Sequence, residues 1–152
     1  MTPEAIKENF IAQFPSAVAE ENMDWPAFQV EASEWKQIAN HLRTHPDWHC
    51  DFLFCLTCVD WKTHLTMVYH LRSTQHRHDF VVKVKLDREN PVIDTVSDTW
   101  RTAEFHEREV YELFGVQFQG HPDLRLLILP DGWEGKNPLR KDFDDPVNMI
   151  KL

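Results

Sequence analysis

The amino-acid sequence predicts an α+β fold: a mixed, largely antiparallel sheet of about four to five strands, covered by helices and followed by an extended C-terminal arm. Segments with helical periodicity flank a middle region rich in β-branched and aromatic residues. The links between the middle strands are short and polar, which favours antiparallel neighbours. Four prolines and three glycines between Gly120 and Pro146 leave little room for regular structure. We therefore predict an α+β domain over residues 1–119 and a docking arm, not an independent domain, over residues 120–152.

Two helices and a short strand are predicted in the N-terminal part. Residues 2–4 supply an N-cap threonine, a first-turn proline and an early glutamate, and helical apolar spacing continues to Pro15. A short strand is expected near residues 28–30. The second helix begins at residues 31–33 and ends before Pro46, because the residue before a proline avoids the helical conformation.

The middle of the chain predicts four strands and a third helix. The helix runs from about residue 100 to residue 114, with Gly115 in place for a left-handed C-cap. One more short strand is expected at residues 126–129. The four middle strands are predicted at residues 52–60, 65–71, 80–86 and 92–96.

Composition excludes several classes of protein. The net charge of −9 argues against a nucleic-acid partner, which needs clustered Lys and Arg. All four glycines lie at or after Gly115, so neither a dinucleotide fingerprint nor a P-loop can be formed. The sequence lacks a run of the ~18 apolar residues that a membrane span needs. The acidic N-terminus does not resemble a signal peptide, so a cytosolic chain is expected.

Three cysteines have the spacing of a cluster-binding loop. Cys50, Cys55 and Cys58 match the Cys-x4-Cys-x2-Cys pattern of plant-type ferredoxins. A fourth cysteine is missing, and the residues between them are typical of a buried strand. The two-residue period of a strand also points Cys55 to the face opposite Cys50 and Cys58. We interpret them as core cysteines that behave as small hydrophobes, and we predict no metal or cofactor ligand in this chain.

Two histidine pairs are weaker candidates for metal binding. His41 and His45 lie four residues apart on a predicted helix, a spacing that can bind zinc. Both fall in its last turn, where positive charge complements the helix dipole. His76 and His78 flank a polar turn. We predict structural roles for all four.

The segment after residue 106 combines charged, aromatic and turn-forming residues, which is typical of a docking surface. We expect its basic residues to form ion pairs with a partner, its two phenylalanines to act as anchors, and His121 with Asp123 to set a turn. The predicted partner interface, which includes no catalytic residue, consists of Glu107, Arg108, Glu109, Glu112, Phe114, Phe118, His121, Asp123, Arg125, Arg140 and Lys141.

Three stretches resemble a single protein family. They are EREVYELFG at residues 107–115, GHPDLR at residues 120–125 and PLRKDF at residues 138–143. Their order and spacing are similar to those of the C subunit, the 30-kDa-subunit family, of the proton-pumping NADH:quinone oxidoreductase, respiratory complex I. The resemblance covers about residues 100–145, whereas residues 1–99 agree only in length and in helix–strand order.

The resemblance implies a non-catalytic peripheral-arm subunit of that complex, on the cytoplasmic side of the cell inner membrane. It would pack against the quinone-site subunit, the D subunit, and against neighbouring peripheral-arm subunits, and would contact the membrane only through the assembly. NAD, FMN, iron–sulfur clusters and quinone are then expected on partner subunits. The alternatives are the homologous subunit of an energy-converting membrane-bound hydrogenase and, with less support, a stand-alone metal or iron–sulfur protein.

Overall fold

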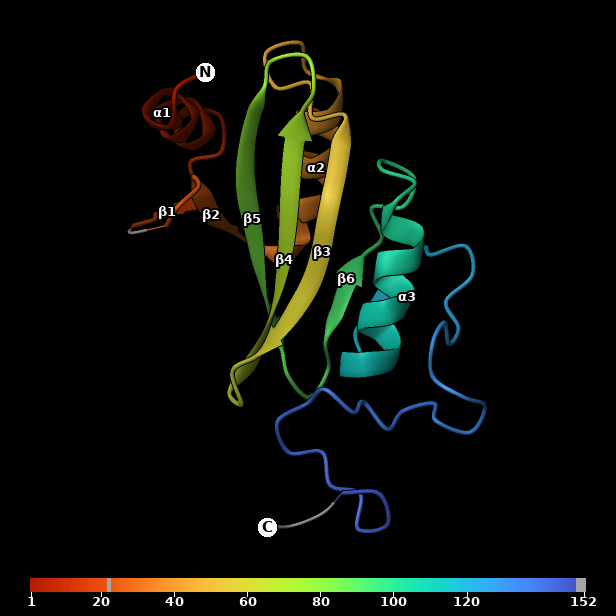
Figure 1. The fold of residues 1–152 in the computed structure, drawn as a ribbon. Coiled ribbons are helices and arrows are strands. Elements are labelled where there is room, and N and C mark those ends of the chain that lie inside the picture. Colours follow the sequence, from red (N-terminus) through yellow and green to blue (C-terminus); the bar gives the residue numbers. More distant parts are fainter. Residues whose placement is uncertain (22, 150–152) are drawn as a thin grey trace.

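The computed structural model describes residues 1–21 and 23–149, and these form two sheets and three helices (Figure 1). The large sheet has the strand order β1-β2-β5-β4-β3, and β6 and β7 form a second, two-stranded sheet. The predicted α+β fold class is therefore confirmed. In chain order the elements are α1 (Pro3–Gln13), β1 (Val18–Glu20), β2 (Ala27–Val30), α2 (Ala32–Thr44), β3 (Phe52–Asp60), β4 (His64–Ser73), β5 (His78–Asp87), β6 (Val92–Asp94), α3 (Ala103–Phe114) and β7 (Gln117–Gln119).

The large sheet is mixed but mainly antiparallel. Strands β3, β4 and β5 form an antiparallel meander with short turns, as the polar links predict. Strand β2 adds parallel to β5, and β1 pairs antiparallel with β2 at the edge. Alternation along β4 places Leu65, Met67, Tyr69 and Leu71 on the core face.

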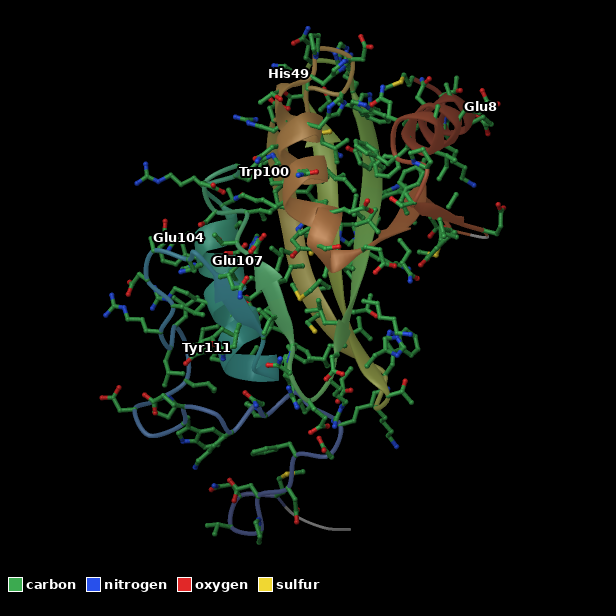
Figure 2. The ribbon with its side chains drawn as sticks, turned by 180° about the vertical axis from the view of Figure 1, so that it is seen from behind. Glu8, His49, Trp100, Glu104, Glu107 and Tyr111 are labelled. Carbon is green, nitrogen blue, oxygen red and sulfur yellow. The ribbon has the colours of Figure 1, made fainter. Side chains whose placement is uncertain are left out.

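The helices lie against the core face of the large sheet and beside its β3 edge. Views from opposite sides show α2 across this face, with α1 near β1 and α3 beside β3 and β6 (Figures 1 and 2). The Thr2 hydroxyl accepts a hydrogen bond from the Ala5 N–H at 3.3 Å and caps α1. Phe10 from α1 stacks on Phe28 from β2 at 3.9 Å between ring centroids, which joins the N-terminal helix to the sheet.

Helix α3 ends as predicted but begins later. Gly115 takes the left-handed conformation with φ +79° and its N–H bonds the Tyr111 carbonyl, which forms the expected C-cap. The chain before Ala103 forms turns instead of helix; the Trp100 N–H bonds the Val96 carbonyl. The start predicted near residue 100 is therefore wrong by one turn.

Three strand assignments need correction. Strands β1 and β7 are present although the sequence predicted neither. The strand predicted at residues 126–129 is absent from the described chain, which curls there. No helix among the described residues combines the length and apolar character required to cross a membrane.

Candidate functional site

The described part of the C-terminal arm, residues 120–149, runs beside α3 and then crosses below the lower ends of α3 and the large sheet (blue in Figure 1). It contains turns and bends but no helix or strand. The last three residues of the predicted arm, 150–152, lie outside the described residues. Four sets of hydrogen bonds attach the arm to the domain, so the boundary predicted at residue 119 separates parts that are bonded together.

His121 attaches the root of the arm to α3. Its Nε2 lies 2.9 Å from the Glu104 carbonyl oxygen, and its Nδ1 accepts a hydrogen bond from the Asp123 N–H at 3.0 Å. Nε2 also lies 3.8 Å from Oε2 of Glu107, and both side chains are fully buried. Figure 2 shows Glu107 on the side of α3 near β6. These contacts form a turn at His121 and Asp123.

Two charged side chains of α3 bind the backbone of the next part of the arm. Arg108 donates to the carbonyl oxygens of Arg125 and Leu126 at 3.1 and 2.6 Å. One turn later, the Glu112 carboxylate accepts from three consecutive N–H groups at residues 127–129, with shortest distances of 2.8, 3.0 and 3.2 Å. Arg108 is 8% exposed and Glu112 is 1% exposed. The helix therefore fixes the conformation of a segment whose backbone forms no helix or strand hydrogen bonds of its own.

The C-terminal end of α3 binds the arm again. Arg140 Nε donates to the Phe114 carbonyl oxygen at 2.7 Å, which satisfies a carbonyl at the helix end and complements its dipole. Gly115 allows the arm to lie close to the end of the helix, because a Cβ at position 115 would lie 2.7 Å from the Asn137 side chain of the arm.

A charged cluster attaches the arm beside the turn of the β3–β4 hairpin. Arg88 bonds Asp60 through two nitrogens, at 2.9 and 2.8 Å, and also reaches Asp142 on the arm at 2.7 Å. The Lys141 N–H donates to Asp60 Oδ2 at 2.9 Å. The hydrogen bonds from the Arg88 guanidinium hold the pKa of Asp60 well below its usual range. Sequence reasoning identified neither Asp60 nor Arg88, because they lie 28 residues apart and belong to separate elements.

The predicted partner interface divides into buried and accessible residues. Six of its members have side chains that are buried within the chain, which removes these side chains from the surface that a partner meets and corrects their assignment. The sequence placed them on a docking surface because charged, aromatic and turn-forming residues lie close together there, whereas the structure packs their side chains inside the chain. The six are Glu107, Arg108, Glu112, Phe114, Phe118 and His121.

The other five predicted interface residues keep at least part of their surface. Arg125 bonds Asp123 at 2.9 Å on the exposed side of the arm. Lys141 lies 5.8 Å from the centre of the Trp61 ring. Glu109 and Arg140 are partly buried. A role in binding a partner stays a prediction for these residues.

The arm also exposes apolar side chains that sequence reasoning did not select. Ile128 is 69% exposed and Leu139 54% exposed, although their backbones lie in the segments attached by Glu112 and Arg140. The sequence contained a feature from which they could have been predicted, because apolar residues occur here in a segment that is too rich in proline and glycine to form a core of its own. We call this set the apolar arm surface; it comprises Leu127, Ile128, Leu139, Val147 and Met149.

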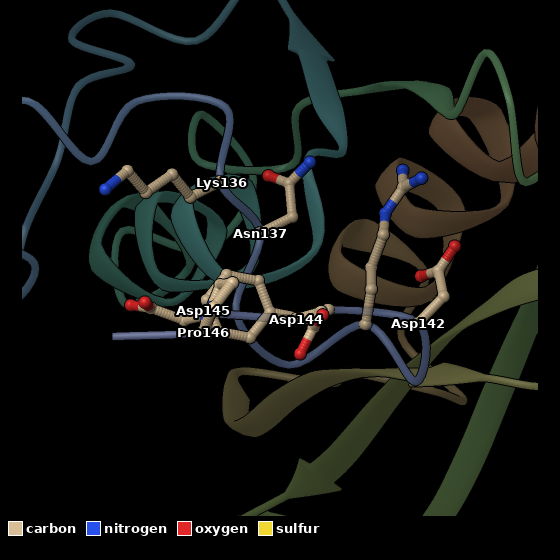
Figure 3. A pocket seen from close by; sticks show the side chains of 8 residues that line it. Lys136, Asn137, Asp142, Asp144, Asp145 and Pro146 are labelled. Atoms are coloured by element: carbon tan, nitrogen blue, oxygen red, sulfur yellow. The ribbon is translucent and has the colours of Figure 1, made fainter. Parts of the chain in front are cut away.

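The last part of the arm folds around an open hollow of about 470 Å³ (Figure 3). Its carboxylates have partners within the chain: Asp142 binds Arg88, and Asp145 accepts from the Asn148 side chain at 2.7 Å. The hollow is thus a product of the turns in the arm. Its lining residues are Lys136, Asn137, Arg140, Asp142, Phe143, Asp144, Asp145 and Pro146.

The three cysteines are not arranged around a common centre. Cys55 pairs with His70 on the outer face of the sheet, whereas Cys58 pairs with Met67 on the core face. Cys50 is fully buried before β3. Burial raises the pKa of the Cys58 thiol to about 12, which disfavours the thiolate needed for metal ligation. The predicted opposition of Cys55 and Cys58 is confirmed.

The histidine pairs make local contacts. The His41 and His45 rings stack at 4.7 Å, and His41 Nε2 lies 3.0 Å from the Gln13 side-chain oxygen. His76 Nε2 lies 2.7 Å from the Pro46 carbonyl oxygen. Among the described residues, no group of three or more His, Cys, Asp or Glu side chains is arranged to hold a metal ion.

These features indicate the class of the protein. An extended arm that is held by buried charged side chains and exposes apolar side chains is typical of a protein that contacts another protein. The chain belongs to the family of the 30 kDa subunit of the respiratory-chain NADH dehydrogenase, whose family model matches residues 28–147. The predicted family is therefore confirmed.

Several relatives of this chain are subunits of NADH-quinone oxidoreductase. The C/D subunit of Phocaeicola vulgatus is 48% identical over 126 residues, which cover 82% of this chain and 24% of that protein. The C subunit of Chloroherpeton thalassium is 40% identical over 78% of this chain and 50% of its own length. The C subunit of Moorella thermoacetica is 38% identical over 90% of this chain and 94% of its own length. The chain thus spans a quarter of the first relative, half of the second and nearly all of the third.

Two solved structures share the fold. A chain of the membrane-bound sulfane sulfur reductase, an archaeal respiratory membrane complex, superimposes with a TM-score of 0.81 at 28% identity and covers 97% of this chain and 88% of its own length. The trypsin-resistant fragment (1–134) of Nqo5 gives a TM-score of 0.69 at 30% identity, with 82% of this chain and all of the fragment covered.

Proposed function

We propose that the chain is the C subunit of an NADH:quinone oxidoreductase and that it packs against the quinone-site subunit through the apolar arm surface. In this role it is non-catalytic. It supports the transfer of electrons from NADH to quinone, coupled to proton translocation, while NAD, FMN, iron–sulfur clusters and quinone bind to other subunits. It lies on the cytoplasmic side of the inner membrane and meets the membrane only through the assembly.

The observation that supports this proposal most is the manner in which the arm is held. Buried Arg108 and Glu112 fix its backbone, yet Ile128 and Leu139 point outward. Ordering a flexible segment on binding costs conformational entropy, and an arm already held by the domain avoids part of that cost. A fixed apolar surface is suited to a permanent protein neighbour.

The quinone-site subunit, the D subunit of the complex, is the partner that the similar proteins favour. The Phocaeicola vulgatus relative is named as a C/D subunit, a name that joins the two subunits in one chain. The part similar to this chain makes up 24% of it, which leaves most of that protein for other sequence. Two subunits joined in one relative are expected to be neighbours when they are separate chains.

Co-purification with an affinity-tagged quinone-site subunit tests the proposal. Ile128→Asp places a charge on the apolar arm surface and should lower recovery of the chain at least tenfold, which corresponds to about 1.4 kcal/mol. Val18→Asp is the matched control, because Val18 on β1 is 63% exposed and lies away from the arm, against 69% for Ile128. Wild-type recovery of Ile128→Asp would show that this surface is not the interface.

A related membrane complex with another electron donor is the second candidate. The likeness to a chain of the sulfane sulfur reductase, at a TM-score of 0.81, supports it. This candidate includes the homologous subunit of an energy-converting hydrogenase. Mass spectrometry of the purified complex distinguishes the candidates: NADH-oxidising subunits support the first, and nickel-hydrogenase or other donor subunits support the second.

A further inference from the structure

A buried carboxyl and a buried imidazole meet at the root of the arm. Glu107 lies on α3, and His121 is the second residue after β7; each side chain is 0% exposed, with 3.8 Å between Oε2 and Nε2. Two apolar side chains could fill this place with a lower desolvation cost. The structural role proposed above does not require an ionisable pair here.

The hydrogen bonds at His121 define its tautomer. Nδ1 accepts from the Asp123 N–H, so the proton of the neutral ring is on Nε2. Nε2 can then donate to the Glu104 carbonyl oxygen at 2.9 Å. In this state the ring lies against Glu107, and both ring nitrogens have a hydrogen-bond partner.

The Glu107 carboxyl has only neutral hydrogen-bond donors. In the ionised form Oε2 accepts from the Thr95 hydroxyl at 2.5 Å and Oε1 from the Val96 N–H at 2.8 Å. In the protonated form the first of these bonds reverses, and the carboxylic acid donates its proton to Thr95 Oγ1. Burial raises its pKa to about 7, although these two bonds act in the opposite direction.

Charged and titratable groups on the surrounding elements face the same carboxyl. Lys36 on α2 binds the Thr95 carbonyl oxygen at 2.7 Å and lowers the pKa of Glu107, whereas Asp98 in the loop before α3 raises it. On β4, burial raises the pKa of Tyr69 well above its usual value, and the Glu107 charge adds to this effect. Cys58 on β3 also raises the pKa of Tyr69. A proton on Glu107 thus removes a charge that this environment solvates poorly.

We propose that Glu107 and His121 form a proton-controlled latch for the C-terminal arm: a protonated Glu107 keeps the arm root closed, and loss of the proton favours its opening to water. Opening moves His121 away and hydrates the carboxylate. The latch restricts movement at the root, while the attachments at Arg108, Glu112 and Asp60 hold the rest of the arm.

Linkage gives the size and the pH window of the effect. In the open state Glu107 is hydrated and takes its ordinary pKa of 4.5, whereas in the closed state the value is about 7. The ratio of open to closed chains therefore rises by up to about tenfold per pH unit between these values and levels off above them. If the apolar arm surface binds the quinone-site subunit, which rests on the proposed function, rising pH loosens the root of that interface.

Hydrogen exchange and NMR on the full chain test the latch. The side-chain carboxyl signal of Glu107 should titrate with a midpoint near pH 7. The Val96 and Asp123 amides report opening directly, because they donate to Glu107 and His121. After division by the intrinsic exchange rates, their opening should rise roughly sevenfold from pH 5.5 to 6.5 and level off above about pH 7.5.

Two variants isolate the carboxyl from other titrating groups. Glu107→Gln keeps an acceptor for Val96 and should remove this rise, whereas Glu109→Gln, a partly buried glutamate on the same helix, should behave as wild type. A Glu107 midpoint near 4.5, or an unchanged rise in Glu107→Gln, overturns the latch. If Glu107→Gln does not fold, the wild-type titration decides. Because these measurements use the chain alone, their outcome is independent of co-purification with the quinone-site subunit.

Discussion

Replacement of Glu112 by Gln tests whether α3 holds the arm. The carboxylate is 1% exposed and accepts three consecutive backbone N–H groups at residues 127–129. A carboxamide has one acceptor oxygen, and its NH₂ group would face the remaining N–H donors. We therefore expect the segment to detach from α3 while the sheet stays folded.

The expected cost follows from the number and the environment of these bonds. A hydrogen bond to a charged group contributes about 1.5–3 kcal/mol net, and a donor that regains water loses less. Leu127 and Ile128 are exposed, so their N–H groups can be hydrated after release. If each of the three bonds contributes about 1.5 kcal/mol or somewhat less, detachment of the segment costs about 2–4 kcal/mol.

Native-state hydrogen exchange at residues 127–129 is the suitable assay, because it measures local opening separately from global unfolding. Glu112→Gln should lower the opening free energy of these amides by about 2–4 kcal/mol, whereas amides of β4 should change little. Glu109→Gln should leave both sets unchanged. Unchanged protection at residues 127–129 in Glu112→Gln would show that the carboxylate does not hold the arm.

Further outcomes are expected. The pKa of Glu107 in the folded chain, about 7, exceeds its ordinary value of 4.5, so the native state retains a proton between these two pH values that the unfolded state has lost. The free energy of unfolding, measured with denaturant, should therefore fall by about 3 kcal/mol as the pH rises through this window. Glu107→Gln should reduce this fall. Replacing Cys50, Cys55 and Cys58 with Ala or Ser should cost at most a few kcal/mol and leave the complex active; loss of a paramagnetic centre in the purified chain would contradict this. Isolated chain should show no saturable NADH binding by calorimetry, and a micromolar dissociation constant would refute the argument from glycine content. Truncation after Gln119 should leave a chain that folds but is less stable, and should abolish recovery with the quinone-site subunit; assembly at wild-type yield would exclude the arm as the docking element.

The middle of the fold could be predicted because its signals are local. Alternation along residues 52–60 and 80–86 and the short links between strands specify an antiparallel meander without tertiary information. The caps at Thr2 and Gly115 depend only on neighbouring residues. These elements appear in the structure close to their predicted bounds.

The missed and false strands depend on contacts between distant segments. Strand β7 forms because Phe118 pairs with Ile93 of β6, and β1 is a three-residue edge strand that exists through its pairing with β2. Residues 126–129 have the apolar composition of a strand, but successive N–H groups of a strand point to opposite sides. Here three in succession point to one carboxylate, Glu112, so the backbone must curl.

The candidate site was not predictable residue by residue. The aromatic, charged and turn-forming residues after position 106 lie where helix and arm meet, and their role in docking to a partner stays a prediction. Whether a charged side chain there binds a partner or its own chain depends on the path of the arm. Arg108 and Glu112 hold the arm, and Ile128, which looked like part of a strand, faces outward.

The cluster of Asp60, Arg88 and Asp142 has a consequence for the order of folding during synthesis. Arg88 and Asp142 are 54 residues apart, so Asp60 and Arg88 are translated well before the arm that completes the cluster. At roughly 5–20 residues per second, Asp60 and Arg88 can pair seconds before Asp142 leaves the ribosome. The meander can therefore fold first, and the arm closes onto it afterwards. A nascent chain stalled before residue 140 would keep Asp60 without its bond from the Lys141 N–H, and the arm surface would form only after the arm has left the ribosome.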